Sequence, residues 1–271
     1  MLAFASNSLL CRAALGGGLI DAASFTTVRV LAGAITLALI MLPAWRAHGR
    51  TKGEWRAVLM LFTYMVFFSF AYVSLSAGTG ALILFGAVQL TMFTVALRRG
   101  EHFSGWSWIG LIMAILGLIY LVSPGLTAPD PLGAVLMAVA GIAWGGYSLL
   151  GRGLANPLEA TASNFIFSAP LVLVVSLVFM GDIHVSITGL ALAIASGAIA
   201  SGLGYVVWYA ALRGLTMTRA ATVQLSVPVI AAIGGVVLLA EEISLRLVLA
   251  SIATLGGVAI VLLQRKARAN S

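Results

Sequence analysis

The chain has 271 residues, of which 61% are hydrophobic and 8% are charged, and its mean hydropathy is +1.10. Soluble domains carry about 25% charged residues, so this composition excludes a soluble enzyme, a disordered protein and a nucleic-acid-binding protein. The net charge of +7 would suggest a phosphate-bearing partner for a soluble domain, but membrane proteins collect Lys and Arg in their cytoplasmic loops. We therefore predict a polytopic helical protein whose surroundings are the lipid bilayer.

Helices that span a bilayer need roughly 20 apolar residues each. Divided at its glycine, proline and charge clusters, the chain contains ten apolar segments. In chain order they lie at about 2–18, 23–43, 55–76, 79–97, 106–123, 132–151, 160–180, 187–211, 216–239 and 245–264. Runs such as 59–70 are apolar at successive positions, which differs from the alternation of barrel strands. The prediction is an all-α integral membrane fold with ten transmembrane helices and short connections.

The basic residues indicate how these helices are oriented. If the N-terminus is cytoplasmic, the outer side keeps Arg246, Arg12 lies near an outer helix end and Arg29 falls inside a span. The inner loops and tail then hold Arg46, Arg50, Lys52, Arg56, Arg98, Arg99, Arg152, Arg213, Arg219, Arg265, Lys266 and Arg268. Twelve of the fifteen basic residues are thus on the cytoplasmic side, as the positive-inside rule requires. We predict a multi-pass inner-membrane protein with both termini in the cytoplasm.

The two halves of the chain share a collinear pattern. Ser8-Leu9-Leu10-Cys11-Arg12 matches Ser148-Leu149-Leu150-Gly151-Arg152. Further matches are Asp21-Ala22 with Glu159-Ala160, Gln89-Leu90-Thr91 with Gln224-Leu225-Ser226, and Glu101, Ser104 and Gly117 with Glu241, Ser244 and Gly257. These matches predict repeats at 1–125 and 131–265, followed by a short tail at 266–271. Each repeat has five spans, an odd number, so the second is inverted, and a substrate site is expected near the midplane between them.

Three motifs together resemble a known family. Asn7-Ser8 with Arg12, Trp144-Gly145, and Gln224-Leu225-Ser226-Val227-Pro228 leading to Glu241-Glu242 look like the EamA-type branch of the drug/metabolite transporter superfamily. The resemblance covers the whole chain as two tandem five-helix units. It implies ten helices, cytoplasmic termini and, commonly, export of amino acids or other small metabolites.

Polar side chains within spans usually face a cavity or another helix. Arg29 is a candidate partner for a substrate carboxylate, and the alternative is a structural pair with Asp21 or with helix-end carbonyls. Gln89 and Gln224 occupy equivalent positions in spans four and nine. Their amides can donate and accept hydrogen bonds, which suits a zwitterionic substrate. The alternative role for both glutamines is a hydrogen bond between helices.

Aromatic and helix-breaking residues complete the candidate site. Small-molecule pockets are lined mainly by aromatic and apolar side chains, and the candidates here are Trp144, Tyr147, Tyr205 and Trp208. Pro228 and Gly86 are expected to act as hinges, since proline removes a helical hydrogen bond and glycine adds flexibility. The alternatives are that the aromatic residues belong to an aromatic belt at the membrane interface, that Pro228 gives a static bend, and that Gly86 serves close helix packing.

The polar groups also restrict the chemistry. The single cysteine and three scattered histidines predict no metal or cofactor site, and no nucleophile and base fall together within the spans, so no enzyme activity is expected. The favoured function is alternating-access export of small metabolites, amino acids foremost, including aromatic or other apolar ones. Export of drugs or of solutes resembling nucleotide sugars, and a non-transport scaffold, are the alternatives. The glycines around Gly110 and Gly257 form helix-packing faces, and a homodimer that packs through these faces is a further possibility.

Overall fold

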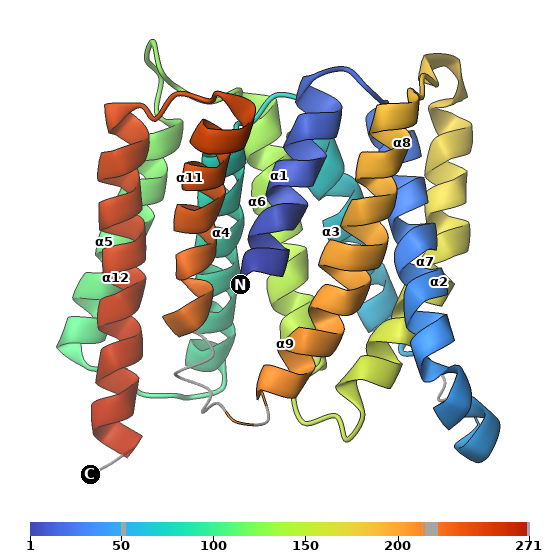
Figure 1. Cartoon of the computed structure of the whole chain (residues 1–271). Helices are drawn as coiled ribbons and strands as arrows, with labels where there is room; N and C mark the ends of the chain where they lie inside the picture. The colour runs from blue at the N-terminus through green and yellow to red at the C-terminus, as the bar shows by residue number, and fades with distance from the viewer. Residues whose placement is uncertain (50–52, 213, 215–221, 270–271) are drawn as a thin grey trace.

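The structure is a computed structural model that describes residues 1–49, 53–212, 214 and 222–269, with the backbone alone for 264–269. Figure 1 shows the helices side by side, roughly along one common direction. In chain order they are α1 (Leu2–Gly16), α2 (Ala22–His48), α3 (Trp55–Ala71), α4 (Ala77–Arg98), α5 (Gly105–Val122), α6 (Pro131–Leu150), α7 (Pro157–Val178), the short 3-10 helix η1 (Met180–Asp182), α8 (Ile187–Ile194), the π-helix η2 (Ala195–Leu203), α9 (Gly204–Leu212), α11 (Ser226–Leu239) and α12 (Leu245–Ala269).

The predicted all-α membrane fold is confirmed. Within the described residues, eight helical stretches are long and apolar enough to cross a membrane, and α3 is a shorter apolar helix. α1 has 15 residues. The α8–η2–α9 stretch forms one continuous span over 187–212, and helical residues 222–224 precede α11 in the ninth span. Each predicted segment therefore contains a helix. Residues 216–221 of the ninth predicted segment (216–239) lie outside the described residues.

Two helices extend further than the hydropathy pattern predicts. α2 continues past Pro43 to His48, and α12 continues to Ala269. The apolar segment ends where the bilayer ends, but the helix can continue into water if its residues have high helix propensity. The last residues of α12 are Gln, Arg, Lys and Ala, which are good helix formers. The boundaries of a span and of its helix therefore differ at this end of the protein.

A π-helical stretch in the eighth span was not predicted. In η2, Gly197 lies directly against the Arg29 carbonyl of α2, where a side chain would not fit. Asn7 of α1 accepts hydrogen bonds from Ser196 (2.8 Å) and Ser201 (3.3 Å). These contacts tie η2 to both α1 and α2. Hydropathy does not report the change from i→i+4 to i→i+5 bonding, and π-segments often mark functional positions.

Helix packing follows a pseudo-two-fold axis between the halves. α6 packs on α3 and α4, and its counterpart α1 packs on α8, η2 and α11. Equivalent spans also pack on each other: α2 on α7, α4 on α11, and α5 on α12. In Figure 1, α1 runs toward the end of the molecule at which α6 begins, so the two helices point in opposite directions. This is the packing expected of an inverted repeat.

The crossing of α5 and α12 shows the symmetry at single residues. Gly117 lies against Thr254, and Gly257 lies against Ala114. The two glycines are 140 positions apart, and so are their two partners, so exchanging the halves converts one contact into the other. Gly110 lies against Gly257 in the same crossing. These glycine faces are thus packed against each other within one chain and do not form a dimer interface. The homodimer itself stays a prediction.

The connections at the two ends of the bundle differ in charge. One end, named here the basic end, carries the connections after α2, α4, α6 and α9, with Arg46, Arg56, Arg98, Arg99 and Arg152 among its described residues. The opposite end, named the far end, carries the connections after α1, α3, α5, α7 and α11 (Figure 1). Its carboxylates are Asp21, Asp130, Asp182, Glu241 and Glu242.

Candidate functional site

A cavity of about 1330 Å³ enters the bundle from the basic end. The connections at this end line its mouth, with the exposed side chains of Glu54, Glu101, Arg152 and Asn156 among them. Deeper in the bundle its walls come from α4, α6, α7 and α9. Small-molecule sites usually measure about 300–1,000 Å³, so this cavity can hold a metabolite together with water.

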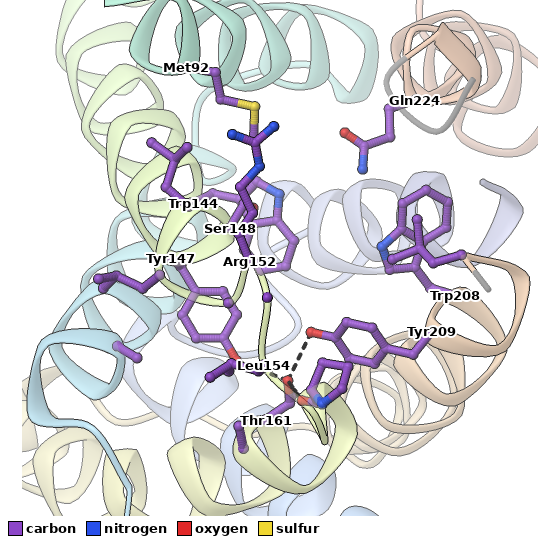
Figure 2. A pocket seen from close by; sticks show the side chains of 18 of the residues that line it. Met92, Trp144, Tyr147, Ser148, Arg152, Leu154, Thr161, Trp208, Tyr209 and Gln224 are labelled. Carbon is purple, nitrogen blue, oxygen red and sulfur yellow. Dashed lines mark hydrogen bonds between the residues drawn. The ribbon is translucent and has the colours of Figure 1, made fainter. Parts of the chain in front are cut away.

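Aromatic side chains form the walls of the cavity. Trp144 and Tyr147 of α6 stack at 5.5 Å between ring centroids, and Tyr205 and Tyr209 of α9 stack at 6.1 Å. Figure 2 shows Trp144 and Tyr147 on one side of the space and Trp208 and Tyr209 on the other. All five side chains line the cavity. An apolar or aromatic group can therefore lie between two aromatic faces, which attract rings and cations.

A chain of hydroxyl groups fixes one amide at the wall. Thr161 donates its single proton to the Pro157 carbonyl (2.8 Å), so it accepts from both Tyr147 (3.0 Å) and Tyr209 (2.9 Å). Because the Tyr147 hydroxyl donates its proton to Thr161, its oxygen accepts a hydrogen bond from the Asn164 amide nitrogen (3.4 Å). The remaining atom, Asn164 Oδ1, is an acceptor that finds no hydrogen-bond partner among the described residues. Its direction as an acceptor is set by the network.

The two predicted glutamines both line the cavity. Both are half-buried, and Gln89 Nε2 is a buried donor with no hydrogen-bond partner in the described part of the chain. Gln224 lies just before a turn at Leu225, and its side chain projects into the space in Figure 2. Pro228 lacks the N–H that would bond the Gln224 carbonyl, which accounts for the break in the helix at Leu225.

Pro228 itself lies in the first turn of α11, where a proline is tolerated. The break in the ninth span therefore precedes the proline, beside the cavity. Gly86, the other predicted hinge, lies within the uninterrupted α4 and faces the Leu118 side chain of α5 so closely that a methyl group would collide with it. Close packing is thus the visible role of Gly86, and its role as a hinge stays a prediction.

Arg29 does not line the cavity. Its side chain is fully buried, its Nη2 donates to the Tyr64 hydroxyl (3.3 Å), and its guanidinium carbon is 4.8 Å from the Phe68 ring centroid. Tyr64 contacts Trp144 at 4.8 Å between centroids, so one aromatic layer separates Arg29 from the cavity. Asp21 does not serve as its partner, because it caps α2 through Ser24 N and also accepts from His184 N.

The far end of the bundle is closed beyond Trp144. A residual space of about 10 Å³ remains there, room for one water molecule at most. It is lined by Phe4, Ser8, Tyr64, Phe68, Leu84, Phe85, Trp144 and Gln224. Trp144 and Gln224 also line the large cavity, so they separate an open half of the bundle from a closed half.

An ion pair lies at the closed end. Arg12 Nε is 3.0 Å from Glu241 Oε1, and Arg12 Nη1 also donates to the carbonyls of Tyr72 and Val73. Glu241 Oε2 accepts from the Ala77 N–H at the start of α4 (2.9 Å). The pair therefore joins α1 and the α11–α12 connection to the ends of α3 and α4.

Comparison with known proteins identifies the family. The model of the EamA-like transporter family matches residues 131–263. A Pseudomonas aeruginosa protein, described as uncharacterized, is 50% identical over 269 residues, which cover 99% of this chain and 94% of the relative. The chain belongs to the EamA-like transporter family.

More distant similarities agree with this membership of the drug/metabolite transporter superfamily. An uncharacterized transporter of Archaeoglobus fulgidus is 28% identical over 74% of each chain. The uncharacterized transporter YwfM of Bacillus subtilis is 26% identical over 69% of this chain and 65% of its own. One crystal structure shares the fold, with a TM-score of 0.67, 20% identity, and coverage of 97% of this chain and 98% of that one.

This EamA-like transporter also contains site residues that the sequence did not single out. Thr161 and Asn164 lie three residues apart on one face of the predicted span at 160–180, and that spacing could have indicated a site. The pairing of Arg12 with Glu241 across 229 positions had no local signal. Within the described residues, no group of three His, Cys, Asp or Glu side chains could hold a metal ion.

Proposed function

We propose that this transporter exports amino acids with apolar or aromatic side chains across the inner membrane by alternating access. Two side chains that line the cavity carry the proposal, because each has a buried polar atom without a hydrogen-bond partner in the described part of the chain. Asn164 Oδ1 is an acceptor and Gln89 Nε2 is a donor, and neither has a partner among the described residues. Buried polar groups without a partner cost free energy. The two ends of a zwitterion would satisfy both once these side chains turn toward the cavity: its ammonium would bind the acceptor and its carboxylate the donor.

The surroundings of the two atoms support the same assignment. The aromatic faces of Trp144 and Tyr147 attract an ammonium group and bind an apolar side chain. Arg152 lines the cavity nearer its mouth, and its guanidinium is a further donor for a carboxylate. The arginines that line the cavity among the described residues, Arg99 and Arg152, are both exposed and lie at the connections near its mouth, so they are not positioned to bind a phosphate group at the deeper aromatic wall. These features favour an amino acid over a solute resembling a nucleotide sugar.

Loop charge indicates which side of the membrane the cavity faces. Cytoplasmic loops are rich in Lys and Arg, so the basic end is assigned to the cytoplasm, together with both termini. The cavity then faces the cytoplasm, and the far end, closed by the Arg12–Glu241 pair, faces the periplasm. In this arrangement the protein takes up its substrate from the cytoplasm and releases it after the closed end opens.

Counterflow into proteoliposomes with labelled leucine, phenylalanine and tryptophan tests the proposal. We expect saturable uptake that unlabelled substrate competes for and that analogues lacking either the amino or the carboxyl group compete for poorly. Asn164→Leu and Gln89→Leu should each reduce uptake about tenfold or more, since each removes a hydrogen bond to a charged group, worth about 1.5–3 kcal/mol.

A matched control separates binding from folding. Thr254 also has a buried polar atom without a partner among the described residues, but it lies in the α5–α12 crossing and outside the cavity. Thr254→Val should leave uptake unchanged. If no amino acid is taken up while a drug or a nucleotide sugar is, the substrate assignment is wrong and the transport fold stands. If no solute of any class shows saturable uptake, the scaffold alternative is favoured.

A further inference from the structure

The ion pair at the far end holds four parts of the bundle together. Arg12 and Glu241 are 25% and 14% exposed, and their 3.0 Å contact is supplemented by backbone groups on both sides. The arginine also binds the end of α3, and the carboxylate binds the first N–H of α4. Opening this end requires α1 and the α11–α12 connection to separate from α3 and α4. The pair must therefore break whenever the far end opens.

The repeat places a second arginine and a second glutamate at the other end. Arg152 is 140 positions after Arg12, and Glu241 is 140 positions after Glu101. The same offset relates the symmetric contacts in the α5–α12 crossing, Gly117 with Thr254 and Gly257 with Ala114. Exchanging the halves thus turns a contact between Arg12 and Glu241 into one between Arg152 and Glu101.

Local backbone geometry confirms that the two glutamates are equivalent. Each follows a residue in the left-handed region: Gly100 (φ 80°) precedes Glu101, and Ala240 (φ 53°) precedes Glu241. After each glutamate, a serine three residues later caps the next helix. Ser104 accepts from Ser107 N, and Ser244 accepts from Leu247 N. The same turn therefore presents a glutamate at each end of the molecule.

The second pair lies where the cavity is open. Arg152 and Glu101 both line the cavity, and both are exposed, whereas Arg12 and Glu241 are largely covered. Both residues have interaction partners in the present arrangement. Equivalent serines report the same asymmetry: Ser8 is 1% exposed in the closed half, and Ser148, 140 positions later, lines the open cavity.

We infer that Arg12–Glu241 and Arg152–Glu101 are alternating locks, of which the first closes the far end and the second closes the basic end. In a pseudo-symmetric transporter the two end states are related by exchanging the conformations of the halves. The state opposite to the one described here then has Arg152 bound to Glu101 and Arg12 released from Glu241. Each lock stabilises one end state, so the two locks set the ratio of the end states. This inference rests on the proposed alternating access.

Matched cysteine reporters test the inference without any knowledge of the substrate. Ser8→Cys and Ser148→Cys are introduced separately in a Cys11→Ala background, because Cys11 is the only native cysteine. The purified protein is placed in lipid nanodiscs, which leave both faces accessible, and the rate of maleimide labelling is measured for each reporter. Uptake assays are run separately, so a wrong substrate would not affect this result.

Breaking either lock should change the maleimide-labelling rates of the two reporters in opposite directions. Arg12→Gln and Glu241→Gln should accelerate labelling of Ser8→Cys roughly 5- to 30-fold, the range expected when one end state loses one or two kcal/mol, and should slow labelling of Ser148→Cys. Arg152→Gln and Glu101→Gln should slow labelling of Ser8→Cys by a similar factor.

Arg246→Gln is the control. Arg246 lies at the far end, where its guanidinium binds the carbonyls of Leu121, Ser123 and Pro124 and takes no part in either lock, so both reporters should keep their rates. A general loosening of the fold would accelerate both reporters in every variant and would overturn the inference. So would an Arg152→Gln variant that leaves Ser8→Cys labelling unchanged or accelerates it.

Discussion

At the scale of single residues, the site depends on how hydrogen bonds constrain one another. The orientation of Asn164 is not a free choice, because Thr161 gives its proton to Pro157 and thereby requires the protons of Tyr147 and Tyr209. The acceptor at the cavity wall follows from this order. Sequence analysis could place the aromatic residues and glutamines in the site, but the network depends on side chains from α6, α7 and α9 that are brought together only by packing.

Tyr147→Phe tests the network directly. The substitution keeps the ring and its stacking on Trp144 but removes the hydroxyl that accepts from Asn164, so the amide is free to turn. We expect the KM for amino-acid counterflow to rise about fivefold or more, corresponding to a hydrogen bond of about 1 kcal/mol, with little change in the maximal rate. Tyr120→Phe, at an exposed tyrosine outside the cavity, is the control. An unchanged KM would show that the orientation of Asn164 does not matter for binding.

Replacing Arg29 tests whether a buried charge outside the cavity contributes to transport. Its Nε and Nη1 have no hydrogen-bond partner among the described residues, and replacing a poorly paired buried charge with an apolar side chain is often neutral or stabilising. We expect Arg29→Met to keep or raise the Tm and to lower counterflow, because Arg29 contacts Tyr64 and Phe68 and so holds the aromatic layer behind Trp144. A large loss of Tm with normal transport by the folded fraction would instead assign Arg29 a structural role.

At the scale of helices, hydropathy predicted where spans occur but not how they deviate from regular geometry. Apolar length is sufficient to locate α2 to α12, since the bilayer sets it. The π-helix η2 and the break at Leu225 depend instead on neighbours: Arg29 and Thr36 of α2 lie against glycines of η2, and Pro228 removes a bond to Gln224. Both deviations lie on the second half, so the repeats are related without being identical.

Pro228→Ala tests the role of the helix break beside the cavity. The variant restores an N–H four residues after the Gln224 carbonyl, and a continuous helix becomes favourable across Leu225. We expect the Tm to rise by a few degrees, of the order that about 1 kcal/mol produces, and counterflow to slow severalfold. Pro170→Ala, inside α7 and exposed, serves as a proline control. A higher Tm with undiminished counterflow would make the break a static feature.

At the scale of the whole molecule, the charge pattern and the repeat predicted the architecture because both are properties of the entire chain. A single offset of 140 positions relates the symmetric contacts of α5 with α12 and the two arginine–glutamate pairs. The end at which the cavity opens was not predictable, since neither the charge pattern nor the repeat carries information about which end is open. The structure supplies it: the cavity is open at the basic end, and the far end is held by Arg12 and Glu241.

The most direct test of alternating access is a reversible crosslink at the closed end. Gly78 of α4 lies directly against Ala232 of α11, so Gly78→Cys with Ala232→Cys in a Cys11→Ala background can form a disulfide between these helices. Gly117→Cys with Ala253→Cys forms the matching crosslink between α5 and α12, which we treat as scaffold. We expect oxidation to abolish counterflow in the first pair, reduction to restore it, and the second pair to transport in both states. Undiminished counterflow with α4 and α11 crosslinked would contradict the account.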